Sequence, residues 1–192
     1  MATPSLVLAS TSPRRLELLA RIGVVPARLA APDIDETPLK GESPTAYVTR
    51  LAEAKARAVD RAPGEVVLAG DTTVAVGARI LEKPADEADL RRMLGLLSGR
   101  RHRCVSGVCA IDAAGRARVR HAATVVAFKR LSAAEVDWYV ASGEGMGKAG
   151  GYAIQGRAEA FVRFLSGSHS AVVGLPLFET RALLIASGLT LA

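Results

Sequence analysis

The stretch that decides the fold is Leu6-Val7-Leu8-Ala9-Ser10-Thr11-Ser12-Pro13-Arg14-Arg15. Its apolar run, residues 6–9, predicts a buried strand, and the leucines that follow the stretch predict a helix that stops at Gly23. Ser12 is a favourable N-cap, and Pro13 suits the first helical position. A helix N-terminus attracts anions, and an arginine guanidinium fits phosphate oxygens. The stretch therefore predicts a strand, a turn and a phosphate site where the helix begins.

The rest of the chain alternates strand and helix patterns. Helices are predicted from Ser43-Pro44 to about Ala62, from Asp86 to Ser98-Gly99, from Ser132 to about Ser142, and over 175–187. Strands are predicted over 27–30, 65–70, 73–76, 79–82, 103–111, 116–128 and 161–165, and residues 143–151 form a glycine-rich loop. We expect an α/β fold in one domain, residues 1–192, in which a mixed central sheet flanked by helices forms two lobes around an active-site cleft.

Composition narrows the class of protein. A length of 192 residues is enough to bury a substantial core. The net charge of +6 fits either a basic surface or an anionic partner such as a phosphate-rich substrate. Aromatic residues make up only 4% of the chain and the basic residues are scattered, so we expect no nucleic-acid partner. Because no apolar run is long enough to span a membrane and no signal peptide is visible, we predict no membrane partner and a cytoplasmic location.

The two cysteines, Cys104 and Cys109, lie in the same predicted strand. Their odd spacing places them on opposite faces of the sheet, because side chains alternate along a strand. We therefore predict neither a disulfide nor a shared metal, as in a protein of a reducing compartment.

Two charged residues stand out for chemistry. Asp71 follows the apolar residues 65–70 directly, and ligands gather where the strands of α/β folds end. The alternative for Asp71 is a turn aspartate bound to nearby backbone. Lys55 falls on the apolar stripe of its helix, seven residues after Val48 and four after Leu51. An inward lysine needs an anion, unless its ammonium reaches solvent at the edge of the stripe.

The loop around residues 33–36 and the segment at Lys83 give weaker signals. Asp33, Asp35 and Glu36 could supply oxygen ligands to Mg²⁺ together with substrate phosphates, or they form a solvated acidic turn. Lys83 precedes Pro84, which favours an extended backbone, and by itself it is consistent with an exposed loop lysine.

Two further motifs are rejected. Gly147-Lys148 lacks both the first glycine and the hydroxyl residue of a phosphate-binding loop. Ser168-His169-Ser170 lacks the glycines of a serine-hydrolase elbow.

Seven short segments follow one another along almost the whole chain: Leu8 to Arg15, Asp35-Glu36, Glu53 to Ala56, Gly70-Asp71-Thr72, Glu82-Lys83-Pro84, Lys148 to Gly156, and Gly167-Ser168 with Val173 to Leu177. Together and in this order they resemble the Maf family of nucleoside triphosphate pyrophosphatases. The resemblance implies a fold like that of the Maf and inosine triphosphatase proteins, and commonly a homodimer. It also implies metal-dependent hydrolysis of a nucleoside triphosphate to the monophosphate and pyrophosphate.

The resemblance also implies roles for single residues. Asp71 matches the family's proton acceptor, and Lys55, Lys83 and Glu36 match other catalytic positions. Ser10 and Arg15 match positions on the phosphate side. We expect Glu36 and Asp71 to hold Mg²⁺ or Mn²⁺ with the phosphate oxygens.

Substrate choice follows from three further positions. Arg14, Thr72 and Gln155 resemble the dTTP/UTP branch of the family, whereas the branch that acts on 7-methyl-GTP carries Trp, Gln and Glu there. His169 departs from the tyrosine that is common at its position. We therefore predict hydrolysis of dTTP and UTP, with modified pyrimidine triphosphates as an extension. The alternatives are a house-cleaning pyrophosphatase for modified purine triphosphates and a non-enzymatic regulator of septum formation or cell division.

Overall fold

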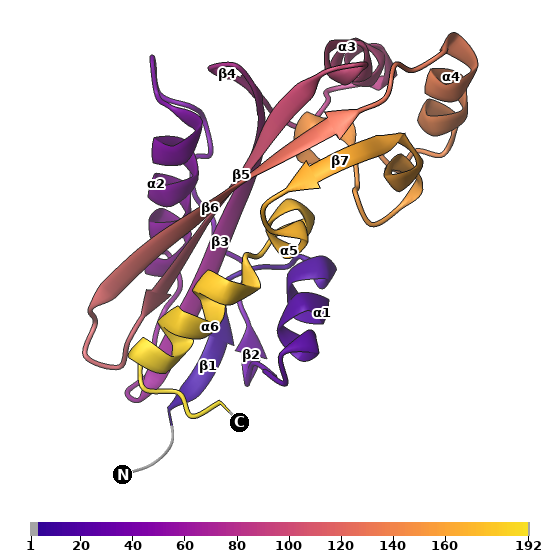
Figure 1. Cartoon of the computed structure of the whole chain (residues 1–192). Coiled ribbons are helices and arrows are strands. Elements are labelled where there is room, and N and C mark those ends of the chain that lie inside the picture. The colour runs from indigo at the N-terminus through magenta and orange to yellow at the C-terminus, as the bar shows by residue number, and fades with distance from the viewer. Residues whose placement is uncertain (1–3, 192) are drawn as a thin grey trace.

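Figure 1 shows the computed structural model of the protein, which describes residues 4–191. Within these residues, one seven-stranded sheet has the order β2-β1-β3-β5-β6-β7, and β4 pairs with β3. β1 runs parallel to β2 and β3, whereas the other neighbours are antiparallel. The strands are β1 (Ser5–Leu8), β2 (Arg28–Leu29), β3 (Glu65–Val76), β4 (Arg79–Leu81), β5 (Arg101–Ile111), β6 (Ala117–Phe128) and β7 (Val162–Ser166). The predicted mixed α/β sheet is confirmed.

Helices cover both faces of the long strands. α2 (Pro44–Arg57) lies on one face, and α1 (Pro13–Arg21), α5 (His169–Val173) and α6 (Leu177–Ala186) lie on the other (Figure 1). α3 (Glu87–Leu97) and α4 (Ala133–Ala141) lie next to each other at the upper right of Figure 1, and α3 also contacts the short helix η1 (Ala149–Gly151). The short helix η2 (Arg157–Phe161) directly precedes β7. No helix within residues 4–191 is long and apolar enough to cross a membrane.

The core follows from the alternation of side chains along the strands. Leu6 and Leu8 of β1 face the large cluster beneath α1 and α6, whereas Val7 and Ala9 face α2. Because β1 is apolar on both faces, it belongs in the middle of a sheet covered on both sides. The apolar run predicted as a buried strand therefore does form an interior strand of the sheet, between β2 and β3.

The predicted placement of the two cysteines on opposite faces of the sheet is confirmed. Cys104 and Cys109 are both buried and unbridged, and they belong to different clusters of the core. Burial disfavours the charged thiolate and raises the pKa of each thiol to about 12. Both are therefore unreactive packing residues.

Three predicted boundaries are wrong. The strand predicted over 65–70 runs on to Val76, because β5 pairs with it from Val67 to Ala75. Asp71 thus sits inside β3 rather than after it. The helix predicted to reach Ala62 ends at Arg57. The helix predicted over 175–187 is α6, from Leu177, and the separate α5 precedes it, because Gly174 takes a φ of 141° and Pro176 opens α6.

Gly107 permits the close contact between α2 and β5. A Cβ at Gly107 would lie 2.3 Å from the carbonyl oxygen of Val48 in α2. We expect Gly107→Ala to push α2 outward, to lower the free energy of unfolding by about 1–3 kcal/mol, and to lower activity with it. Gly95→Ala is the control: Gly95 is exposed in α3 with nothing within 4 Å, so alanine should stabilise by about 0.5–1 kcal/mol. Urea denaturation measures both, and equal stabilities would contradict the packing argument.

Candidate active site

The candidate site lies where β3 has an open edge. β1 pairs with β3 only up to Leu68, and β4 begins to pair at Val74. Within the described residues, no strand pairs with that edge of β3 between these two positions. A cleft of about 770 Å³ is lined by the exposed part of this edge. Side chains from both faces of β3 can therefore enter one cavity.

All nine residues predicted for the site line this cleft: Ser10, Arg14, Arg15, Glu36, Lys55, Asp71, Thr72, Lys83 and Gln155. They come from the turn after β1, α1, the loop before α2, α2, β3, the segment after β4, and the turn before η2. The sequence separates them by up to 145 positions, but the fold gathers them at a single opening.

Lys55 is the centre of the most buried part of the cleft. Its Nζ donates to Asp71 Oδ1 at 2.7 Å and lies 2.8 Å from Glu36 Oε1. Lys55 and Asp71 are each only 6% exposed. The prediction that Lys55 points inward to an anion is confirmed. One ammonium therefore holds two carboxylates from different segments side by side.

The two carboxylates differ in their electrostatics. Burial disfavours the charge on Asp71 and raises its pKa, although Lys55 and Arg15 oppose the shift. Burial also acts against ionised Glu36, but the hydrogen bond from Lys55 and the charges of Lys55, Lys83 and Arg15 outweigh it and lower the pKa of Glu36. Asp71 is thus the better proton acceptor, and Glu36 is the more firmly ionised carboxylate.

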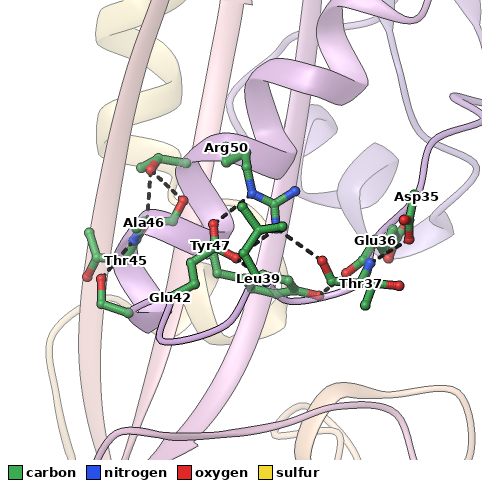
Figure 2. A network of polar contacts seen from close by, with 11 residues as sticks. Asp35, Glu36, Thr37, Leu39, Glu42, Thr45, Ala46, Tyr47 and Arg50 are labelled. Atoms are coloured by element: carbon green, nitrogen blue, oxygen red, sulfur yellow. Dashed lines mark hydrogen bonds and ion pairs between the residues drawn. The ribbon is translucent and has the colours of Figure 1, made fainter.

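The N-terminal half of α2 fixes the loop that carries Glu36 (Figure 2). Tyr47 Oη donates to the main-chain oxygen of Glu36 at 2.9 Å. Arg50 donates to the main-chain oxygen of Thr37 at 3.2 Å and pairs with Glu42 at 2.7 Å. α2 therefore supplies Lys55 and also positions the loop opposite it. Sequence reasoning missed Tyr47, although it lies on the stripe of Lys55, two turns earlier.

The three acidic residues of that loop differ in their contacts and in their exposure. Asp35 lines the cleft, but its Oδ1 accepts the backbone N–H of Thr37 at 2.8 Å, so it closes its own turn. Asp33 is exposed and is not part of the cleft lining. Of the three candidates for a cation, Glu36 is the one that faces Asp71 across Lys55.

The start of α1 supplies the second cationic group. Arg15 donates from Nε to the main-chain oxygen of Gly174 at 2.9 Å and from Nη1 to Ser10 Oγ at 3.1 Å. Burial lowers the pKa of Arg15, and the nearby carboxylate of Asp71 opposes that shift. Ser12 occupies the predicted N-cap position, but its side chain accepts no bond from the helix. The N–H groups of the first turn therefore keep their capacity for an anion.

The remaining side chains line the outer part of the cleft. Arg14 is half-buried, Gln155 is exposed, and the ammonium of Lys83 lies 3.8 Å from Glu36 Oε2. Sequence reasoning missed Lys148, which also lines the cleft; its Nζ donates to the main-chain oxygen of Glu144 at 2.6 Å. Burial and the charge of Arg14 lower the pKa of Lys148. Its signal in the sequence is the segment Gly147-Lys148, which does not match the pattern of a phosphate-binding loop.

The donor set for a metal consists of two carboxylates. Within residues 4–191, no group of three or more His, Cys, Asp or Glu side chains is placed to hold an ion. Glu36 and Asp71 each give one oxygen to Lys55, which leaves Asp71 Oδ2 and Glu36 Oε2 as available ligands. This set fits Mg²⁺ or Mn²⁺, which are commonly held by one or two carboxylates and the phosphates of the substrate.

The chain is similar to several known proteins. A protein from Sphingopyxis alaskensis named dTTP/UTP pyrophosphatase is 79% identical over 98% of this chain and 99% of its own length. A protein of the same name from Novosphingobium aromaticivorans is 62% identical over 97% of this chain and 93% of its own length. The solved structure of a HAM1 protein from Coxiella burnetii is similar over 67% of this chain and 74% of that chain, with a TM-score of 0.45 and 18% identity. The family model described as Maf-like protein matches residues 5–187, and this chain therefore belongs to the Maf family.

Proposed function

We propose that this protein hydrolyses dTTP and UTP, and by extension modified pyrimidine triphosphates, to the monophosphate and pyrophosphate. The observation that carries the proposal is the buried group in which Lys55 holds Asp71 and Glu36 together, at the floor of a cleft that Arg15 enters. The relatives that bear the name dTTP/UTP pyrophosphatase, at up to 79% identity over nearly the full length, support the choice of substrate.

The reaction requires a cationic environment for a polyanionic substrate. Arg15, Lys55, Lys83 and the N-terminus of α1 neutralise the triphosphate, and Ser10 orients Arg15 through its hydroxyl. Asp71 uses Oδ1 to accept from Lys55, and its Oδ2 takes a proton from the attacking water. The water oxygen bonds to the α-phosphorus, the bond from that phosphorus to the bridging oxygen breaks, and pyrophosphate leaves with the electron pair.

A divalent cation fits this arrangement. Glu36, through the oxygen that Lys55 leaves available, and the carboxylate of Asp71 would hold Mg²⁺ or Mn²⁺ together with the substrate phosphates. When bound, such an ion offsets phosphate charge and lowers the pKa of a bound water. Removing the ion with a chelator should stop turnover without unfolding the protein, because Lys55 still pairs with both carboxylates.

The outer part of the cleft suits recognition of the base. Gln155 is exposed there and can present its amide to the O4 and N3 edge of thymine or uracil. Arg14 and Thr72 line the same cleft. These three residues are our candidates for the choice of nucleotide.

The cellular setting is part of the same proposal. Both cysteines are buried and unbridged, which supports a reducing compartment such as the cytoplasm. We also propose a single functional domain over residues 1–192 that forms a homodimer. Size-exclusion chromatography with light scattering tests the dimer.

A nucleotide panel with pyrophosphate detection, in Mg²⁺ and in Mn²⁺, tests the activity. We expect dTTP and UTP to be turned over most efficiently. The two alternatives predict other results: modified purine triphosphates would be preferred, or no triphosphate would be hydrolysed. Gln155→Glu, in the same panel, should lower activity on dTTP and UTP about tenfold, because a carboxylate cannot donate to O4. An unchanged preference in this variant would remove Gln155 from base recognition.

A further inference from the structure

Ser106 lies directly behind the wall of the cleft, in contact with Thr72. Ser106 is fully buried in β5, it is not part of the cleft lining, and it pairs with Thr72 in the register of β3 and β5. Its Oγ lies 2.7 Å from Thr72 Oγ1 and 2.6 Å from the main-chain oxygen of Ala171 in α5. A chain of two hydrogen bonds therefore runs from Thr72 at the cleft, across one face of the sheet, to α5.

The direction of this chain follows from the chemistry of its members. A carbonyl oxygen can only accept, so Ser106 must give its single hydroxyl hydrogen to Ala171. Towards Thr72, the Oγ of Ser106 can then only accept, and the Thr72 hydroxyl must donate. The hydrogen of Thr72 is thus directed away from the bound ligand. Thr72 retains only lone pairs for a molecule in the cleft.

We propose that Ser106 is a positioning residue that makes Thr72 an acceptor-only group in the nucleotide site. The proposal rests on the proposed function and adds a reason for its substrate class. Uracil and thymine carry an N3–H donor, whereas N3 of cytosine is an acceptor. A lone pair of Thr72 attracts the N3–H of uracil and thymine and repels the lone pair on N3 of cytosine. The chain through Ser106 therefore favours UTP and dTTP over CTP.

The test compares the kcat/KM of UTP with that of CTP in the purified, full-length protein. In Ser106→Ala, the hydrogen of Thr72 loses its acceptor in the sheet and can turn towards the cleft. We expect the UTP-to-CTP ratio to fall about tenfold, mainly through a lower KM for CTP, the size of effect expected when one hydrogen bond changes. Thr72→Val, which lacks the acceptor, should lose the preference as well, whereas Thr72→Ser should keep it.

Thr124 provides a matched control for the structural part of the role of Ser106. It is also fully buried, and it anchors the start of α5 by accepting from Ser168 N at 3.0 Å and donating to Ser168 O at 3.1 Å, whereas the side-chain partner of Thr72 is Ser106. Thr124→Val should therefore loosen α5 without changing the UTP-to-CTP ratio. If Thr124→Val lowers the ratio as much as Ser106→Ala does, the anchoring of α5 is the cause and the proposal is wrong.

The other outcomes are also decisive. A wild-type ratio in Ser106→Ala, with UTP turnover intact, overturns this inference and leaves the proposed function standing. Should Ser106→Ala fail to fold, the comparison of Thr72→Val with Thr72→Ser decides, and equal ratios in these two variants overturn the inference. A wild-type protein that turns over neither UTP nor dTTP instead refutes the proposed function itself.

Discussion

Asp71→Asn should lower the rate of pyrophosphate release from dTTP and UTP by about 10³-fold while leaving the fold intact. The substitution keeps the shape of the side chain and an oxygen that can accept from Lys55, whose ammonium also keeps Glu36 as a partner. It removes the negative charge and the basic oxygen that would take the proton from water. Because burial already raises the pKa of Asp71, a neutral side chain is tolerated at this position.

The measurement needs a second carboxylate of the same cleft as a control. Asp35 lines the same cleft, but its side chain accepts the N–H of Thr37, a bond that asparagine can also make. We expect Asp35→Asn to retain activity within about fivefold of wild type, since such a conservative change removes no required proton acceptor. Thermal denaturation should show both variants folded. Comparable activity in the two variants, or near-wild-type turnover in Asp71→Asn, would exclude Asp71 as the proton acceptor.

Local patterns predicted the core of the site well. The position of Lys55 on the apolar face of α2 follows from helical periodicity, which depends only on neighbouring residues, and the structure buries it as expected. The same holds for the strand and helix around residues 6–15, where the N-cap and the Pro at the first helical position are both in place. The nine candidate residues share a cleft, but their selection came mainly from the resemblance to a family.

Features that depend on distant pairing were not predicted. The sequence around Gly70 looks like the end of a strand, yet pairing with β5, about 35 residues later, carries β3 on to Val76. Consequently, Asp71 was assigned to the end of a strand and lies instead at an unpaired part of its edge. Ser106 reaches Thr72 only through that pairing, so periodicity could not reveal it. Long-range register is a tertiary property that a single sequence pattern does not encode.

Lys55→Met should have the largest effect on stability. Methionine keeps the length of the stem but leaves the Asp71 carboxylate buried without its hydrogen-bonded cation, and breaking such a pair costs about 3 kcal/mol of the free energy of unfolding. The contribution of Glu36 is smaller, because its side chain is 42% exposed and water screens its charge. Activity should fall as well, since Lys55 holds both carboxylates in place. Urea denaturation measures the loss, and Lys83→Met, whose ammonium is exposed, should change stability by less than about 0.5 kcal/mol.

A pH series and a double variant show whether the loss of stability in Lys55→Met comes from an unpaired buried charge or from poorer packing. Once Lys55 is gone, burial acts unopposed by its nearest cation and raises the pKa of Asp71 further in the folded state. A carboxyl group whose pKa is raised on folding binds more protons in the folded state, so stability falls as the pH rises through the range in which it ionises. The stability gap between Lys55→Met and wild type should therefore be wider at pH 8 than at pH 5.

Lys55→Met with Asp71→Asn, which removes both charges, should recover most of the lost stability, because no buried ion is left unpaired. If the double variant is as unstable as Lys55→Met, or if the gap does not depend on pH, then lost packing, and not an unpaired Asp71, explains the effect.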